Sequence, residues 1–181
     1  MTISGKQIAD TAVNSGLLGT PYAKMDCQAF VEAVLAKAGL RIINYRGSNH
    51  MWRELVYDRN TVRGNTVPAG ALVFIVRFDG GEKKRGYHDD AGNATHVGIA
   101  LGDGRVMEST TGGVQYGNLS RFTDFGLIKD VDYTEKGTSD GGESDAGAGR
   151  ADFGRLMQLI GIVRDNVDEL EEYIRGHYQN A

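Results

Sequence analysis

The single cysteine of the chain, Cys27, stands where a thiol can act as a nucleophile. It follows Asp26, a good helix N-cap residue. An apolar stripe with helical spacing comes next, at Phe30, Val31, Val34 and Leu35. At the first turn of a helix, backbone N–H groups and the helix dipole favour the thiolate. Asp26 opposes this effect unless its carboxylate turns toward the backbone or a substrate amine. A small buried hydrophobe is the alternative interpretation of Cys27.

His96 is the candidate general base for this thiol. It stands near the start of an expected strand whose apolar residues alternate from Val97 onward. The histidine shares the other face with Gly98 and Ala100, which leave room for another element to approach. The alternative is a histidine whose hydrogen bonds are satisfied inside the core.

Four stretches of the sequence form a pattern when they are taken together. They are Pro21-Tyr22, Asp26-Cys27, the apolar strand after Pro68, and the stretch HVGIALGDG that begins at His96. This pattern, over roughly residues 4–120, resembles the NlpC family of cell-wall cysteine peptidases. The resemblance implies a papain-like α+β core, with the cysteine on a helix and the histidine on an adjoining antiparallel sheet. It also implies cleavage of peptidoglycan stem peptides, commonly beside the γ-linked D-glutamate.

The resemblance assigns the nucleophile to Cys27 and the base to His96. The family's third polar residue, usually a histidine twelve positions after the first, falls on Glu108. A carboxylate that accepts a hydrogen bond from the imidazole fixes its tautomer and stabilises the imidazolium. The resemblance further implies that Tyr22 borders the site and that Asp26 binds a substrate amine. Simple packing is the alternative interpretation of Tyr22.

The sequence departs from the family's pattern next to the cysteine. The usual DCSG is DCQA here, so Gln28 replaces a serine that commonly helps to hold substrate. The spacer between Tyr22 and Asp26 is also shorter than usual. We therefore expect Gln28 to contact substrate in a subsite that differs from the family's.

Glu108 reaches the side of His96 in only one of two hairpin registers. A turn of two residues between the strands places Glu108 opposite Ile99, on the wrong face. A turn of three residues, 102–104, places it opposite Gly98, on the face of the histidine. The triad therefore requires the longer turn or an equivalent bulge.

The elements expected around these residues change from helices to strands along the chain. Helices are predicted at 4–18, 27–38 and 47–56, and strands at 71–77, 95–101, 105–110 and 114–116. A polar surface loop is predicted over 79–93. We expect one α+β, papain-like hydrolase domain over residues 1–133, with its N-terminal helices packed on an antiparallel sheet.

The rest of the chain has a different composition. Residues 134–152 contain five glycines and five acidic residues and are predicted to be a flexible linker. Residues 153–181 are predicted to form an amphipathic helix, with a seam of Phe153, Leu156, Ile160, Val163, Val167, Leu170 and Ile174. We expect residues 153–176 to associate with another helix, in a homo-oligomer or a larger assembly. Docking on its own domain is the alternative.

Composition excludes several classes of function. A net charge of −4 without a block of Lys and Arg argues against nucleic-acid binding. A single cysteine rules out an internal disulfide and a Cys-pair zinc site, and we expect no metal and no cofactor. His50 and His88 are expected to face solvent, and His177 to be structural.

The N-terminus lacks a signal-peptide pattern, and no apolar run approaches a membrane span of ~18 residues. We therefore expect synthesis in the cytoplasm and a phage or prophage enzyme that acts on the cell wall. By resemblance, the leading function is a cysteine endopeptidase of peptidoglycan. The alternatives are an amidase of the CHAP type, which also pairs Cys, His and Glu, an acyltransferase with the same core, and a non-catalytic component docked through its C-terminal helix.

Overall fold

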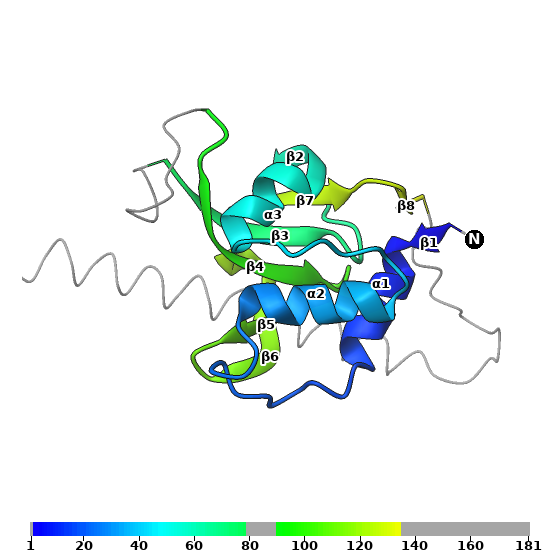
Figure 1. Ribbon diagram of the computed structural model, residues 1–181. Coiled ribbons are helices and arrows are strands. Elements are labelled where there is room, and N and C mark those ends of the chain that lie inside the picture. Colours follow the sequence, from blue (N-terminus) through cyan, green and yellow to red (C-terminus); the bar gives the residue numbers. More distant parts are fainter. Residues whose placement is uncertain (1, 79–89, 135–181) are drawn as a thin grey trace, which may run out of the picture. The chain divides into compact units, whose positions relative to one another are not determined.

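The computed structural model describes residues 2–78 and 90–134 (Figure 1). Three α-helices occur in this part of the chain: α1 Gly5–Val13, α2 Cys27–Lys37 and α3 Ser48–Glu54. The strands of the main sheet are β2 Val56–Thr61, β3 Leu72–Arg77, β4 Asn93–Ala100, β5 Arg105–Thr110, β6 Gly113–Asn118 and β7 Asp124–Ile128. A 3₁₀ turn, η1, covers Leu119–Arg121, and β1 Ile3–Ser4 pairs in parallel with β8 Val131–Asp132.

The main sheet has the order β2-β7-β3-β4-β5-β6, and its neighbours are antiparallel. The predicted α+β class is therefore confirmed. Strands β2 and β7 of this sheet were not predicted from the sequence. Five of the six residues of β2 are exposed, so it has no apolar alternation, and β7 is a five-residue strand with a central glycine.

Helix α2 lies across one face of this sheet, over β4 and β5, and α3 also packs on β4 (Figure 1). The apolar stripe predicted for α2 is fully buried, since Phe30, Val31, Val34 and Leu35 are each 0% exposed. Each of these large side chains contributes about 1.5–3 kcal/mol of burial free energy before conformational entropy is subtracted. A second apolar cluster, on the other face, includes Val73, Ala100, Val106, Phe122 and Phe125.

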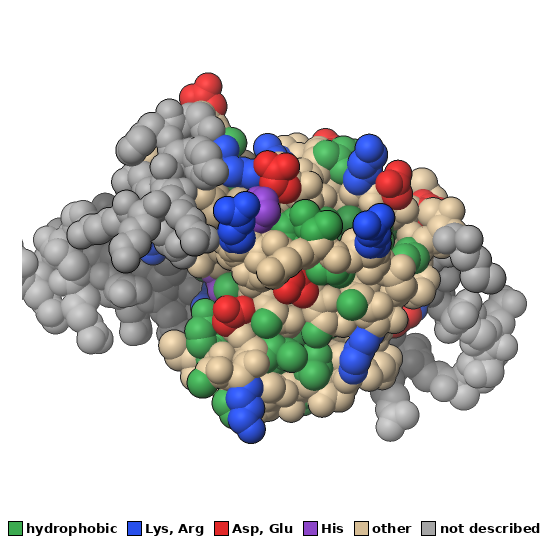
Figure 2. Space-filling model, in the orientation of Figure 1, with side chains coloured by type: hydrophobic (Ala, Val, Ile, Leu, Met, Phe, Trp, Pro, Cys, Tyr) green, Lys and Arg blue, Asp and Glu red, His purple; other side chains and the backbone are tan. Residues whose placement is uncertain are grey.

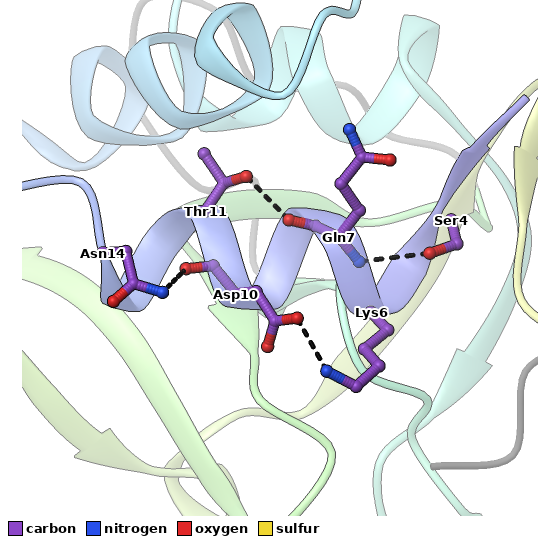
Figure 3. A pocket seen from close by; sticks show the side chains of 6 residues that line it. All are labelled: Ser4, Lys6, Gln7, Asp10, Thr11 and Asn14. Carbon is purple, nitrogen blue, oxygen red and sulfur yellow. Dashed lines mark hydrogen bonds and ion pairs between the residues drawn. The ribbon is translucent and has the colours of Figure 1, made fainter. Parts of the chain in front are cut away.

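Helix α1 is shorter than the predicted 4–18. Its N-cap is Ser4, whose Oγ accepts a hydrogen bond from the Gln7 N–H at 3.2 Å. It ends at Val13 because Asn14 becomes the C-cap, and the Asn14 side chain donates to the Asp10 carbonyl at 2.9 Å. Figure 3 shows these contacts around a hollow of about 360 Å³ on the outer face of the helix.

The polar loop predicted over 79–93 extends too far toward the C-terminus. Asn93 already belongs to β4 and is 1% exposed, and its Oδ1 accepts from the Asn49 side chain of α3 at 3.0 Å. The prediction for His88, most of the predicted linker 134–152, and the helix 153–181 with His177 lie outside the described residues.

The face of the molecule shown in Figure 2 carries Lys and Arg side chains interspersed with Asp and Glu, with small apolar areas between them. Among residues 2–78 and 90–134, no helix has the length and apolar character needed to cross a membrane.

Candidate active site

Two of the predicted site residues, His96 and Glu108, are hydrogen-bonded to each other. The Nε2 atom of His96 lies 2.6 Å from Oε2 of Glu108. The carboxylate is fully buried, with 0% of its side chain exposed, whereas 15% of the His96 side chain is exposed. A carboxylate in this place fixes the imidazole orientation and leaves Nδ1 for another partner.

The hairpin turn between β4 and β5 brings this pair together, as the register analysis required. Leu101 N–H donates to the Arg105 carbonyl at 2.9 Å, and Glu108 pairs with Gly98. The turn is therefore the three-residue one. Both of its glycines, Gly102 with φ 86° and Gly104 with φ 87°, adopt the left-handed conformation that a β-carbon disfavours.

Cys27 is the first residue of α2, and Asp26 caps the helix as predicted. The Asp26 Oδ1 atom accepts from the Ala29 N–H at 2.8 Å, so this carboxylate turns toward the backbone. Cys27 is buried, with 8% exposed, and its thiol lies close enough to the His96 ring to raise the pKa of that ring. Because Nε2 of His96 faces Glu108, Nδ1 is the ring nitrogen that can interact with the thiol.

Hydrogen bonds fasten the loop before Cys27 to the hairpin that carries Glu108. The buried hydroxyl of Ser109 donates to the Met25 carbonyl at 2.5 Å. Gly19 N–H donates to the Val114 carbonyl at 2.8 Å, and Val114 N–H donates to the Thr20 carbonyl at 2.9 Å. The position of the thiol relative to the carboxylate is therefore set by short contacts and not by the hydrophobic core alone.

Helix α3 fastens the strand that carries His96. The Ser48 hydroxyl donates to the Ala94 carbonyl at 3.0 Å, and the Ala94 N–H donates to Asn49 Oδ1 at 3.1 Å. Between Ile75 and Val76 the β3–β4 register shifts, so that Ile75 pairs with His96 and Val76 pairs with Ala94. A bulge of this kind re-aims the side chain that follows it.

Phe122, which no sequence pattern marks, lies beside Gly98 together with the side chain of Val106. A Cβ on Gly98 would lie 3.3 Å from Phe122 Cζ. The Phe122 ring stacks on the His96 ring, with centroids 5.8 Å apart and planes inclined by 25°. The small residues beside His96 thus admit an aromatic ring, which covers one side of the imidazole.

The pKa of His96 results from opposing influences. Burial alone lowers it, while the hydrogen bonds and negative charges of Cys27 and Glu108 raise it, to about 9 from the ordinary 6.5. His96 is therefore an imidazolium at neutral pH. An imidazolium beside a cysteine favours the thiolate, the nucleophilic form of sulfur.

The three predicted substrate-binding residues lie around the start of α2. Tyr22 is 39% exposed and belongs to the turn that precedes the helix, where Lys24 N–H donates to the Pro21 carbonyl at 2.9 Å. Asp26 is exposed and serves as the N-cap. The third, Gln28, uses its amide inside the protein: Nε2 donates to the Tyr45 carbonyl at 2.6 Å, and Oε1 accepts from the Gly47 N–H at 2.5 Å.

Arg121 is a further residue of the site that the sequence did not indicate. Its Nη1 donates to Oε1 of Glu108 at 2.8 Å, while 53% of its side chain is exposed. No periodicity or motif marks it, since it lies in a short polar turn 13 residues after Glu108.

His50 is predicted to face solvent, and in the structure it is only partly exposed. It is half-buried, its Nδ1 accepts from the Arg46 N–H at 3.1 Å, and its ring meets Tyr45 edge-on at 5.5 Å. Within the described segments, no three His, Cys, Asp or Glu side chains are grouped as ligands of a metal ion would be.

The family model of the NlpC/P60 family matches residues 15–123, which is more than half of the chain. The chain therefore belongs to the NlpC/P60 family. The matched range contains the Cys27, His96 and Glu108 cluster, Tyr22, Asp26 and Gln28, and also Arg121.

Solved structures of this family are similar to the chain at low identity. The NlpC/P60 domain of the peptidoglycan hydrolase SagA is 22% identical, with a TM-score of 0.49, over 70% of this chain and 100% of that domain. The P60 domain of an antigen from M. avium subspecies paratuberculosis is 19% identical, with a TM-score of 0.49, over 71% of this chain and 98% of that domain. An NlpC/P60 family protein from Bacillus cereus is 22% identical, with a TM-score of 0.47, over 66% of this chain and 40% of that protein. A comparison with curated proteins finds no match.

Proposed function

We propose that the protein is a cysteine endopeptidase that cleaves stem peptides of peptidoglycan at an amide beside D-glutamate. The observation that carries this proposal is the grouping of Cys27, His96 and Glu108, with the thiol at a helix start and the carboxylate hydrogen-bonded to the imidazole. Membership of the NlpC/P60 family supports the cell wall as the place of action. The SagA domain, to which the chain is similar, comes from a peptidoglycan hydrolase.

In the proposed reaction the Cys27 thiolate attacks the carbonyl carbon of the scissile amide. The electron pair of the carbonyl moves to oxygen and forms a tetrahedral oxyanion. When this intermediate collapses, the C–N bond breaks and the His96 imidazolium donates its proton to the leaving amine. Neutral His96 then takes a proton from water, the hydroxide attacks the thioester, and the thiolate and the acid product are released.

The start of α2 supplies the donors for the oxyanion in this proposal. Asp26 accepts the Ala29 N–H through its side chain and the Phe30 N–H through its carbonyl, at 2.8 Å and 3.0 Å. The oxyanion role therefore falls to the preceding N–H groups of Cys27 and Gln28. Backbone donors fixed before the reaction stabilise the charge that develops in the transition state.

Mass spectrometry of defined muropeptides tests the proposal. Incubation with the full chain should release a peptide fragment that ends in D-glutamate, and Cys27→Ala should release none. Glu108→Gln should retain part of the activity, because an orienting group is partly replaceable and a nucleophile is not. Release of the intact stem peptide from the sugar would show an amidase instead. An intact substrate with folded protein would contradict peptidoglycan hydrolysis.

A further inference from the structure

Glu108 has a second partner besides His96. Its Oε2 lies 2.6 Å from His96 Nε2, and its Oε1 accepts from Arg121 Nη1 at 2.8 Å. The carboxylate is 0% exposed. A buried carboxylate is costly unless both its charge and its lone pairs are matched, and here each oxygen has a cationic partner.

The four groups alternate in sign along the contacts. In the reactive state they are the Cys27 thiolate, the His96 imidazolium, the Glu108 carboxylate and the Arg121 guanidinium, and their charges cancel. Without Arg121 the same buried site carries one uncompensated negative charge. An arginine stays protonated at every pH at which a protein is folded, so this compensation does not vary with pH.

The groups that face Glu108 come from three elements. His96 belongs to β4 and Arg121 to η1, while β6 places the uncharged Gln115 opposite Glu108 and Gly117 beside its carboxylate. Cys27 of α2 interacts with His96. The guanidinium is therefore the cation on the side of the carboxylate away from the imidazole.

A single short segment delivers two contacts to the site. Leu119 N–H donates to the Gly104 carbonyl at 3.0 Å, which fastens η1 to the β4–β5 turn. The Asn118 side chain caps the Ser120 N–H at 3.0 Å. Arg121 then reaches Glu108, and the next residue, Phe122, stacks on His96.

We propose that Arg121 is a positioning residue: it holds the Glu108 carboxylate with Oε2 aimed at His96, and through Glu108 it fixes the imidazole beside Cys27. The inference rests on the proposed cysteine mechanism and not on the identity of the cell-wall substrate. With Arg121 included, the proposed site consists of a Cys, a His, a Glu and an Arg.

A double-mutant cycle on the full chain tests this role. Arg121→Met should lower kcat/KM for muropeptide hydrolysis about tenfold or more, mainly through kcat, and Arg121→Lys should restore part of the loss by restoring the charge. In a Glu108→Gln background the same Arg121→Met change should cost no more than about twofold, because its partner is already gone. Arg105→Met is the matched control, since Arg105 is 59% exposed and pairs with Asp103 at 2.5 Å.

Alkylation of Cys27 by iodoacetamide supplies a readout that needs no substrate. Removing a cation from the buried site disfavours an anion there, so the acid limb of the rate–pH profile should move to higher pH in Arg121→Met and stay in place in Arg105→Met. If Arg121→Met does not fold, Arg121→Gln keeps a hydrogen bond without the charge and should show the same displacement.

Three results would overturn the proposal. An undiminished effect of Arg121→Met in the Glu108→Gln background would assign Arg121 to the substrate. A loss confined to KM would do the same, and an unmoved alkylation profile would leave Arg121 with a structural role only. If muropeptides are not cleaved at all but the profile still moves, the proposed substrate is wrong and the positioning role stands.

Discussion

A Cβ on Gly117 would overlap Oε1 of Glu108. Gly117 lies on β6, next to the strand that carries the carboxylate, and its hydrogen in place of a side chain leaves room for the buried acid. The backbone at Gly117 is not in the left-handed region, so the need for glycine here is steric and not conformational.

Gly117→Ala should therefore displace the carboxylate from His96 and Arg121. We expect hydrolysis to fall about tenfold or more, with a loss of unfolding free energy of about 1–3 kcal/mol from overpacking. Muropeptide kinetics and urea titration measure both. Gly112→Ala is the control, because a Cβ there would lie 3.2 Å from the end of the Gln115 side chain, which can move. Equal losses in both variants would contradict the steric argument.

The pKa of His96 predicts how stability depends on pH. In the folded protein it is about 9, above the ordinary 6.5. A raised pKa means that the folded state binds the proton more tightly, so this contribution is fully present below pH 6.5 and is lost as the pH rises to about 9. We expect the unfolding free energy from urea titrations to fall across this window, by at most about 3 kcal/mol.

Cys27→Ala is the variant that checks the cause. It removes a hydrogen bond and a negative charge that raise the His96 pKa, so the NMR titration of the ring should move below about 9. The stability loss across the same pH window should shrink with it. A ring that still titrates near the wild-type value would show that the thiol does not contact the imidazole.

Local signals in the sequence predicted the helix start and the hairpin register around the candidate site correctly. Asp26 followed by an apolar stripe places the start of α2 at Cys27. The glycines of the 102–104 turn determine the register that puts Glu108 opposite Gly98. Each inference used residues close together in the chain, where backbone preferences and alternation carry the information.

The features of the fold and site that could not be predicted from the sequence depend on contacts between segments distant in the chain. Strand β7 lies between β2 and β3, although it follows β6 in the chain. The insertion of β7 brings η1 across the sheet, and with it Arg121 and Phe122. A half-exposed arginine in a polar turn has no sequence signal of its own. The linker, the associating helix 153–176 and the phage origin stay predictions.

The Ser109–Met25 hydrogen bond predicts a link between the hairpin and the nucleophile. Ser109→Ala removes the donor to the Met25 carbonyl and should cost about 1–3 kcal/mol of stability if that carbonyl stays buried. We also expect faster hydrogen exchange in residues 21–26 and lower kcat, because Cys27 follows this loop. Thr11→Ala is the control, because the Thr11 hydroxyl donates to the Gln7 carbonyl on the exposed face of α1. Unchanged exchange in 21–26 would show that the hydrogen bond does not hold the loop.

Gln28, next to the nucleophile, can either stabilise the architecture of the site or contact substrate, and these two roles can be tested separately. Its amide joins the start of α2 to the Tyr45 carbonyl and the Gly47 N–H, directly before α3, and Glu32 Oε1 accepts from the same amide at 2.9 Å. Since α3 fastens the strand of His96, loosening this junction should disturb the site indirectly.

Gln28→Ser, which restores the serine usual in the family, should therefore destabilise the protein by about 1–3 kcal/mol, as the part-buried Tyr45 carbonyl and Gly47 N–H lose their partner. Glu32→Gln serves as a matched variant, because it keeps the shape and removes only the charge of the neighbouring acceptor. If Gln28→Ser instead leaves the urea midpoint unchanged and raises KM for muropeptides, Gln28 contacts substrate as the sequence suggested. A fall in stability with an unchanged KM would assign Gln28 to the architecture of the site, and the family's serine would then have no functional counterpart at this position.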